Sequence, residues 1–331
     1  MHSDAVATES SQLQLLKEIR PGETYSGWCI VRLFETRYTQ SGDPYRLLEL
    51  GDRSGRLRAR IWQDSPLFHY QIRTGQILWV EASVGSYRSG LSLSPRKIRL
   101  PRPREAPPAY FFLAPANRDP REMLEKLQGE IDKLTTPALK NLLRDILKDG
   151  DFREALMQAP GGKLWHHNRL GGTLEHLLEM LDIAESLFAA HPNIDRDLLK
   201  SGIICSRLGQ VRTFLMAGFI EFSDEGRLLG FPAIGYRFLA ERMAIYEDFP
   251  VETQKQLLHM TLSCEGEKEG VMPMSLEAVA LQKIGDLSAS LDAISRIEKN
   301  DVLPGEKWSK YIPLLDRFVY AGHRLKFHPS R

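Results

Sequence analysis

The chain has 331 residues, of which 42% are hydrophobic and 26% charged, and its formal net charge is +1. These values are ordinary for a globular protein, and the length suits about two domains of roughly 100–200 residues each. No apolar run reaches the roughly 18 residues that span a bilayer, so a membrane partner is not expected.

Residues 1–21 form an N-terminal lead that lacks the basic and apolar regions of a signal peptide. Within it, residues 11–20 are compatible with a short helix. The three cysteines, Cys29, Cys205 and Cys264, are too few and too far apart for a disulfide framework or a CxxC metal site. A reducing, cytoplasmic location is therefore expected.

Alternation with a period of two predicts five strands within residues 22–100. They cover residues 25–38, 45–50, 56–62, 75–84 and 90–100. In the first strand, Cys29, Val31 and Leu33 are expected on one face, and Phe34 on the other. Because short glycine-rich turns join the strands, the pattern predicts a small closed or nearly closed barrel.

Residues 48–62 resemble the OB-folds that bind nucleic acids, because a turn with the pattern apolar-x-Asp-x-x-Gly precedes a strand that ends in Ile-Trp. The face of strands two and three is the usual nucleic-acid platform of OB barrels. Here we expect it to carry Phe34, Tyr45, Arg56, Arg58, Arg60 and Trp62. Arginines match phosphates and aromatic rings stack on unpaired bases, so this face suits single-stranded RNA or DNA. The alternative is a solvated, arginine-rich face.

The charge of the chain is unevenly distributed. Residues 1–104 hold 16 Lys and Arg against 10 Asp and Glu, whereas the remainder holds 28 against 33. In the N-terminal part, Lys17 and Lys97 are the only lysines. This modest excess of arginine favours a nucleic-acid partner for that part.

Residues 101–118 are rich in proline and are predicted to form a semi-rigid linker, with the aromatic run 110–113 holding it against one of the domains. Helical periodicity then dominates residues 119–331, beginning with Asp119 as N-cap and Pro120 at the first helical position. The expected helices cover residues 119–134, 136–149, 151–158, 171–190, 195–205, 233–246, 253–262, 275–297 and 308–321.

Histidines are concentrated in residues 163–176. His166 and His167 are predicted in a loop before a Gly-Gly pair, and His176 lies one turn into the following helix. Such a group indicates metal ligation or phosphate handling, and the alternative is a helix start with a few polar residues.

Five stretches resemble, in order, motifs of the HD superfamily of metal-dependent phosphohydrolases, combined with an OB barrel as in the YhaM-type 3′-5′ exoribonucleases. They are residues 159–176, 197–204, 226–230 and 259–270, and the helix start at 277–278. This resemblance covers roughly residues 22–300. It implies a multidomain fold, in which a small all-β OB-like barrel (22–100) is followed by an all-α HD-superfamily helical domain (119–331). It also implies a metal-dependent 3′-5′ exonuclease.

The positions of the family's metal ligands are occupied by other residues. The family's His-Asp pair falls on Ser206 and Arg207, and its late aspartate falls on Gly285, beside Asp286. Further family histidines fall on Phe231, Cys264 and Glu265. Of the family's metal ligands, His176 is clearly present, and His259 lies near another ligand position. His166 and His167 match family residues that resemble substrate contacts rather than metal ligands.

A single imidazole does not hold a catalytic metal, and a fixed cation at Arg207 opposes one. The residual pocket consists of His166, His167, His176, Arg207 and His259. We therefore expect a catalytically impaired relative of the exoribonucleases, with no resident cofactor, that binds single-stranded RNA or DNA and is compatible with a homo-oligomer.

Two other functions stay open. An active metal-dependent 3′-5′ exonuclease would need a rebuilt site for Mn²⁺ or another divalent ion, and its candidate ligands are His176, His259, Cys264, Glu265 and Asp286. A scaffold protein would use the helical domain for oligomerisation. The pocket itself is read either as satisfied polar core residues or as a phosphate clamp of Arg207 with Lys163, His167 and Arg169.

Overall fold

The computed structural model describes residues 14–322, apart from residues 88–89, 104, 106, 217, 267–270, 301, 303–304 and 314. The described residues form two compact units. One consists of the chain up to Ala114 together with residues 216 and 218–219, and the other consists of the remainder from Pro115 onward.

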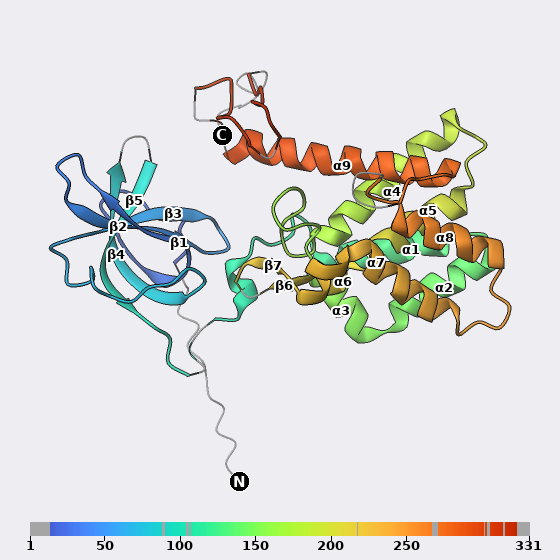
Figure 1. The fold of residues 1–331 in the computed structure, drawn as a ribbon, viewed down its shortest axis with the longest axis horizontal. Helices are drawn as coiled ribbons and strands as arrows, with labels where there is room; N and C mark the ends of the chain where they lie inside the picture. Colours follow the sequence, from blue (N-terminus) through green and yellow to red (C-terminus); the bar gives the residue numbers. More distant parts are fainter. Residues whose placement is uncertain are drawn as a thin grey trace, which may run out of the picture. The chain divides into compact units, whose positions relative to one another are not determined.

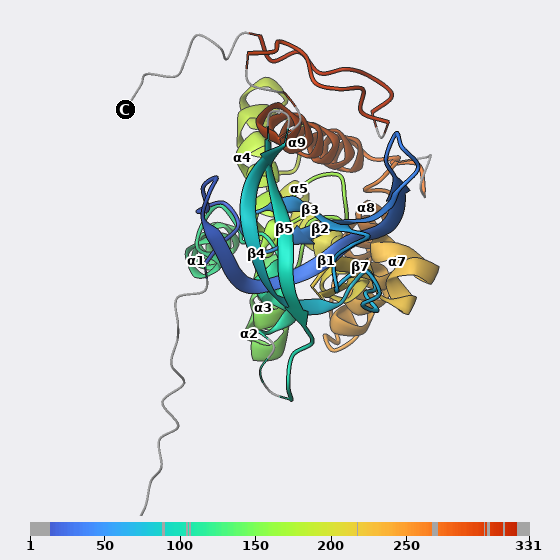
Figure 2. The same cartoon turned by 90° about the vertical axis from the view of Figure 1, so that its left-hand side faces the viewer.

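The first unit is a closed barrel with the strand order β1-β2-β3-β5-β4, an architecture of the OB type (Figure 2). Its strands are β1 (Thr24–Tyr38), β2 (Pro44–Gly51), β3 (Arg56–Trp62), β4 (Ile77–Tyr87) and β5 (Gly90–Arg99). All neighbours pair antiparallel except β3 and β5, whose parallel pairing closes the barrel. The predicted five-stranded barrel is confirmed.

The barrel interior is filled by alternate residues, but the alternation breaks in β1. Cys29 and Val31 are buried in the core, as predicted, whereas Leu33 is 40% exposed. A register shift between Val31 and Leu33 rotates the second half of the strand. Phe34 therefore pairs with Leu48 and packs against the core, and its predicted place on the arginine face is wrong.

The start of the described chain packs against the barrel core. Leu16 and Ile19 are buried in its core. The carboxylate of Asp52, in the turn after β2, accepts the Leu16 N–H at 2.7 Å, and the Ser54 hydroxyl accepts the Lys17 N–H at 3.1 Å. Because these partners hold the backbone, residues 14–20 form a turn, and the helix predicted over 11–20 is absent from its described part.

The outer side of β1 is also covered. The 3-10 helix η1 (Ala109–Phe112) places the Phe112 side chain against Trp28 and Ile30, and all three are buried. The predicted attachment of the aromatic run to a domain is confirmed for Phe112, while the side chain of Tyr110 lies outside the described residues.

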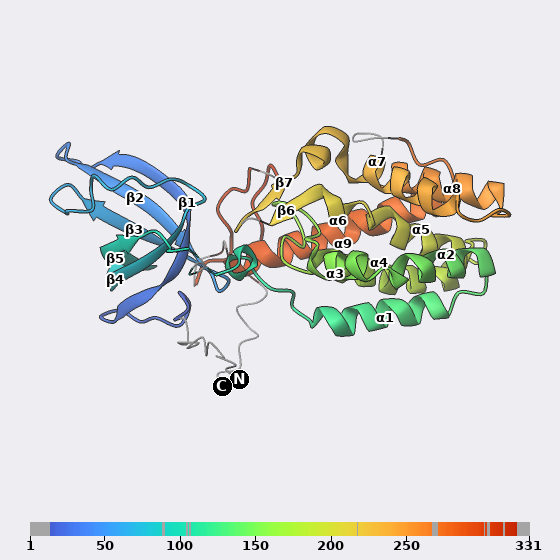
Figure 3. The ribbon, with the colours of Figure 1, turned by 90° about the horizontal axis from the view of Figure 1, so that it is seen from below.

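The second unit is helical (Figures 1 and 3). Its helices are α1 (Pro120–Asp132), α2 (Pro137–Lys148), α3 (Gly150–Gln158), α4 (Gly172–Ala190), α5 (Arg196–Arg207), α6 (Gln210–Thr213), α7 (Asp224–Met243), α8 (Val251–Leu262) and α9 (Leu276–Asn300). Asp119 caps α1 as predicted, with Pro120 at the first helical position. The helix α9 runs alongside α4 and α5. Among the described residues, no helix combines the length and apolar character that a bilayer crossing requires.

Three features depart from the predicted helical array. The short strands β6 (Phe214–Met216) and β7 (Ile220–Phe222) form a two-stranded sheet that adds to the predicted helical domain. The helix α7 starts nine residues earlier than predicted and contains a kink at Gly230, whose φ is 72°. The helix predicted over 308–321 is wrong, because the described residues there form the bridges Trp308–Tyr320 and Ile312–Arg317.

Candidate functional site

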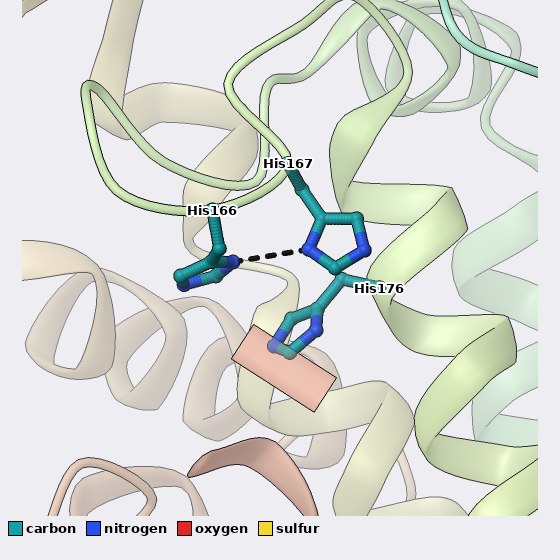
Figure 4. A group of neighbouring side chains, drawn as sticks. All are labelled: His166, His167 and His176. Carbon is teal, nitrogen blue, oxygen red and sulfur yellow. Dashed lines mark hydrogen bonds between the residues drawn. The ribbon is translucent and has the colours of Figure 1, made fainter. Parts of the chain in front are cut away.

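Three histidines converge where the loop before α4 meets that helix (Figure 4). His176 lies on the second turn of α4, and His166 and His167 come from the loop. When one ring nitrogen is taken from each histidine, the three nitrogens lie within 4.8 Å of one another. His167 and His176 are fully buried and His166 is half-buried. The sequence grouped these residues, and the structure brings them together.

The loop is held by backbone and ion-pair contacts. The His167 N–H donates to the Asp292 carboxylate at 2.6 Å, and the second oxygen of Asp292 accepts from Arg169 at 2.8 Å. Arg169 also pairs with Glu175, which is buried. His167 adopts a φ of 45°, and a Cβ at Gly172 would overlap its carbonyl oxygen, so this approach requires glycine.

A single carboxylate orients two of the imidazoles. Glu179 Oε2 lies 3.1 Å from His167 Nε2 and accepts the Ser288 hydroxyl at 2.9 Å. The Ser288 oxygen in turn lies 2.9 Å from His176 Nδ1. Burial acts to raise the pKa of Glu179, but the hydrogen bonds from His167 and Ser288 outweigh it and hold the pKa below its ordinary value.

Because the Ser288 proton goes to Glu179, its oxygen accepts from His176, which places the His176 proton on Nδ1. The other nitrogen, Nε2, is buried and has no hydrogen-bond partner. The same logic puts the His167 proton on Nε2, toward Glu179.

Arg207, at the end of α5, is 3% exposed and lies beside this cluster. Its Nη1 pairs with Glu265 at 2.9 Å, and its guanidinium lies over the Phe231 ring at 5.2 Å. Burial, and after it the charge of Arg207, lower the pKa of His166 to about 3. The same two causes, in the same order, hold the pKa of His176 well below its ordinary value. Both imidazoles are therefore neutral near pH 7.

A cavity of about 470 Å³ opens next to the cluster. Its polar lining includes Lys163, His166, Arg207, Gln210 and Glu265, and Phe231 contributes to its apolar wall. The two cations are already paired, Arg207 with Glu265 and Lys163 with Glu221 at 2.6 Å. His167 and Arg169 do not line the cavity and are engaged elsewhere, so the phosphate clamp predicted from four residues is wrong in its composition.

The other predicted metal ligands do not join His176. His259 Nε2 accepts the Met274 N–H at 2.9 Å, and Glu265 is bound to Arg207. Asp286 accepts from Gln282, and burial raises its pKa. The Cys264 thiol is buried, which raises its pKa to about 12. These residues therefore do not provide the mixed histidine and carboxylate set that a hard divalent ion requires, and the family's metal does not fit here.

Three residues that contact the histidines were not predicted from the sequence: Glu179, Ser288 and Asp292. A signal for them existed, because residues three or four apart share one helix face. Glu179 follows His176 by three residues on α4, and Ser288 and Asp292 are four apart on α9.

The barrel carries a second candidate surface, here called the outer face, formed by β1–β3. Cross-strand pairing aligns Trp62, Tyr45 and Arg37 in one row, Arg60, Leu47 and Glu35 in the next, and Arg58, Glu49 and Leu33 in the third. The Tyr45 and Trp62 rings lie 5.2 Å apart, and Trp62 is 47% exposed. Glu49 pairs with Arg56 at 3.2 Å and Glu35 with Arg37 at 2.6 Å. The structure thus brings together the predicted face residues other than Phe34, and adds Arg37 and two carboxylates.

Comparison with known proteins gives one consistent group of relatives. The chain is 27% identical over 310 residues to the 3′-5′ exoribonuclease YhaM of Shouchella clausii, covering 92% of this chain and 95% of that one. It is 29% identical over 306 residues to YhaM of a Geobacillus species, and the alignment covers 90% of this chain and 92% of that one. It is 26% identical over 304 residues to YhaM of Bacillus subtilis, and the alignment covers 90% of this chain and 95% of that one. The predicted resemblance to YhaM-type exoribonucleases is confirmed over about nine-tenths of the chain.

No family model matches the chain. Two solved structures of a replication protein A domain from Methanococcus maripaludis, one titled its second OB-fold domain, align with 26% of this chain. They are covered to 92% and 91%, at 22% and 21% identity, each with a TM-score of 0.23.

Proposed function

We propose that this chain binds single-stranded RNA or DNA through the outer face of its barrel and does not carry out the metal-dependent hydrolysis of the exoribonucleases it resembles. The relatives are named 3′-5′ exoribonucleases, so the resemblance supports a nucleic-acid strand as the ligand of this chain. We assign the HD-type helical domain that the sequence resemblance implies to residues 119–331.

The rows of the outer face support the binding role. Four arginines stand on this face, Arg37, Arg56, Arg58 and Arg60, against the two carboxylates Glu35 and Glu49. Phosphates need the positive charge, and the exposed Trp62 ring, beside the half-buried Tyr45, offers a surface on which unpaired bases stack. Stacking on an exposed ring accepts any base, so we propose weak sequence preference.

Binding is tested by titrating a labelled single-stranded oligomer with the full chain at several salt concentrations. We expect Trp62→Ala to lose about 1–3 kcal/mol, roughly fivefold to more than a hundredfold in affinity. Arg58→Ala should reduce the slope of log affinity against log salt by about 0.7. Trp308→Ala is the matched control, since Trp308 is 56% exposed and lies in the helical unit. Equal affinity for the Trp62 variant and the wild-type chain would remove the outer face from the proposal.

One observation supports the proposed loss of hydrolysis: the guanidinium of Arg207 is buried and paired with Glu265. The resemblance to the HD superfamily places a metal-binding aspartate at this position. Arg207 is always charged, and a cation there repels the ion that would activate water. We therefore propose no resident hard divalent cofactor.

Loss of hydrolysis is tested with a 5′-labelled single-stranded RNA, incubated with the chain and added Mn²⁺. We expect no shortening from the 3′ end, while YhaM of Bacillus subtilis in the same buffer serves as the positive control. Mn²⁺-dependent shortening that purifies with the chain through two columns would refute this part of the proposal and leave the binding part intact.

A further inference from the structure

We infer that His166, His167 and His176 form a binding site for one transition-metal ion of the zinc type, held by three neutral imidazoles without a carboxylate ligand. The site goes beyond the proposed function, which needs no metal. It also differs from the donor set that the family resemblance implies, since the two share only His176.

Two of the three imidazoles already direct a lone pair inward. The hydrogen bonds through Glu179 and Ser288 place the protons of His167 and His176 on their outer nitrogens. His167 Nδ1 and His176 Nε2 are left as the donor atoms, and His176 Nε2 has no other partner although it is buried. Metal-bound histidines characteristically have their second nitrogen bonded to a carboxylate or hydroxyl in this way, which fixes both tautomer and ring orientation.

The spacing suits a tetrahedral ion. With Zn–N bonds of about 2.0–2.1 Å, the nitrogens of two ligands lie roughly 3.4 Å apart. His166 Nδ1 and His167 Nδ1 are 3.1 Å apart, and the three donor atoms lie within 4.8 Å of one another (Figure 4). The ring centroids are 4.7, 4.9 and 5.4 Å apart. Because His167 Nδ1 is left as an acceptor, His166 Nδ1 is the donor in their 3.1 Å contact, and ion binding requires that proton to move to His166 Nε2.

Imidazole donors select the metal. Three nitrogens without a carboxylate suit Zn²⁺, Co²⁺, Ni²⁺ or Cu²⁺ and are poor ligands for Mg²⁺ or Mn²⁺. His166 also lines the cavity of about 470 Å³, so a fourth ligand, such as water, would approach from that side.

Charge near the cluster is balanced. Arg207 opposes a cation, but Glu265 is paired with it at 2.9 Å. Glu179 binds one imidazole directly, and Asp292 Oδ2 lies 3.9 Å from His167 Nδ1. Glu179 supplies negative charge at close range to a divalent ion, whereas Asp292 shares its charge with Arg169 at 2.8 Å. Arg207→Gln, which removes the opposing cation, should therefore tighten metal binding.

The test uses the full chain without an affinity tag, stripped with a chelator and titrated with Co²⁺. We expect the visible absorption of a four- or five-coordinate Co²⁺ at one ion per chain, displaced by one equivalent of Zn²⁺. His176→Ala should abolish the spectrum. Glu179→Gln, a positioning change, should weaken Zn²⁺ binding about 10–100-fold. His191→Ala is the matched control, because His191 ends the same helix and is exposed.

Absence of a Co²⁺ spectrum in the wild-type chain would overturn the inference, as would binding that persists in His176→Ala. If His176→Ala does not fold, Glu179→Gln decides, because unchanged Zn²⁺ affinity there removes the orienting role on which the site depends. Zinc binding without cleavage of single-stranded RNA supports both the site and the proposed function. Zinc-dependent cleavage supports the site and refutes the proposed loss of hydrolysis.

Discussion

The Nη2 atom of Arg207 lies 2.9 Å from the position that a Cβ on Gly285 would occupy. The missing side chain of one residue thus makes room for the guanidinium of the other. The resemblance to the HD superfamily places an aspartate at each of these two positions. The two differences from the family pattern are therefore coupled in space, because the larger, cationic side chain at 207 needs the absent side chain at 285.

The Arg207–Glu265 pair should respond asymmetrically to mutation. Glu265→Gln leaves a buried cation without its counter-charge, and we expect a loss of about 3 kcal/mol in the free energy of unfolding. Arg207→Met leaves Glu265, whose side chain is 29% exposed, able to turn toward water, and should cost about 1 kcal/mol. Urea denaturation of both variants and the double variant measures the difference. A larger loss in Arg207→Met than in Glu265→Gln would contradict this account of the pair.

Introducing the residues that the HD resemblance places at positions 206, 207 and 285 should create a hard-metal site. We expect the triple variant Ser206→His, Arg207→Asp, Gly285→Asp to bind Mn²⁺ at least about tenfold more tightly than the wild-type chain, because two carboxylates and an imidazole replace a cation. Calorimetric titration with Mn²⁺ measures this gain. The double variant Ser206→His, Gly285→Asp keeps Arg207 and is the control, in which no gain is expected. An equal gain in the control would show that Arg207 does not oppose the metal.

Asp197 should make the stability of the helical unit depend on pH. Its Oδ2 accepts the N–H groups of Thr135 and Thr136 at 2.7 and 2.6 Å, joining α5 to the turn before α2. Burial acts to raise the pKa of Asp197, but these hydrogen bonds outweigh it and lower the pKa. The stabilisation is therefore complete above the unfolded-state pKa of about 3.9 and is lost as the pH falls through the lower folded-state pKa.

At pH 7 we expect Asp197→Asn to lose about 1–2 kcal/mol in the free energy of unfolding. The difference from the wild-type chain should stay constant down to about pH 5 and shrink below pH 4. Urea denaturation at a series of pH values measures it, with Asp248→Asn, at an exposed position, as the control. A difference that persists undiminished at pH 2 would argue against a role of the ionised carboxylate.

Two helical glycines should respond in opposite directions to alanine. Gly230 has a φ of 72° at the kink of α7, where a Cβ is strained, so Gly230→Ala should destabilise the chain by about 1–2 kcal/mol. Gly129 lies within α1, and a Cβ there meets no atom within 4 Å. Gly129→Ala should stabilise by about 0.5–1 kcal/mol. Thermal unfolding of the two variants compares them, and a stabilised Gly230 variant would contradict the assigned strain.

Local signals in the sequence predicted much of the fold. Period-two alternation located all five barrel strands, and the Asp119-Pro120 pair located the start of α1. The bulge that moves Phe34 inward depends on pairing with β2, which no local pattern encodes. The spacing of Trp308, Tyr311 and Phe318 is compatible with a helix, but two isolated antiparallel bridges within that segment, Trp308–Tyr320 and Ile312–Arg317, replace helical pairing.

The candidate site likewise contains residues that the sequence predicts and residues that only the tertiary structure reveals. Three histidines close together in sequence were recognisable as a group. Of their supports, Glu179 shares a helix face with His176 on α4 and could have been found from its spacing. Ser288 and Asp292 lie on α9 and reach the cluster only once that helix packs beside α4. Distant pairs such as Arg207 with Glu265, which decide the charge of the pocket, likewise follow from tertiary structure alone.

The hydrogen bond between the Leu16 N–H and the Asp52 carboxylate has a consequence for the order in which the barrel is completed during synthesis. Leu16 leaves the ribosome 36 residues before its partner does, and its buried place in the core does not exist until the hairpin of β2 and β3 has formed. Leu16 and Ile19 are thus synthesised before the residues that bury them and can dock only after the hairpin is available.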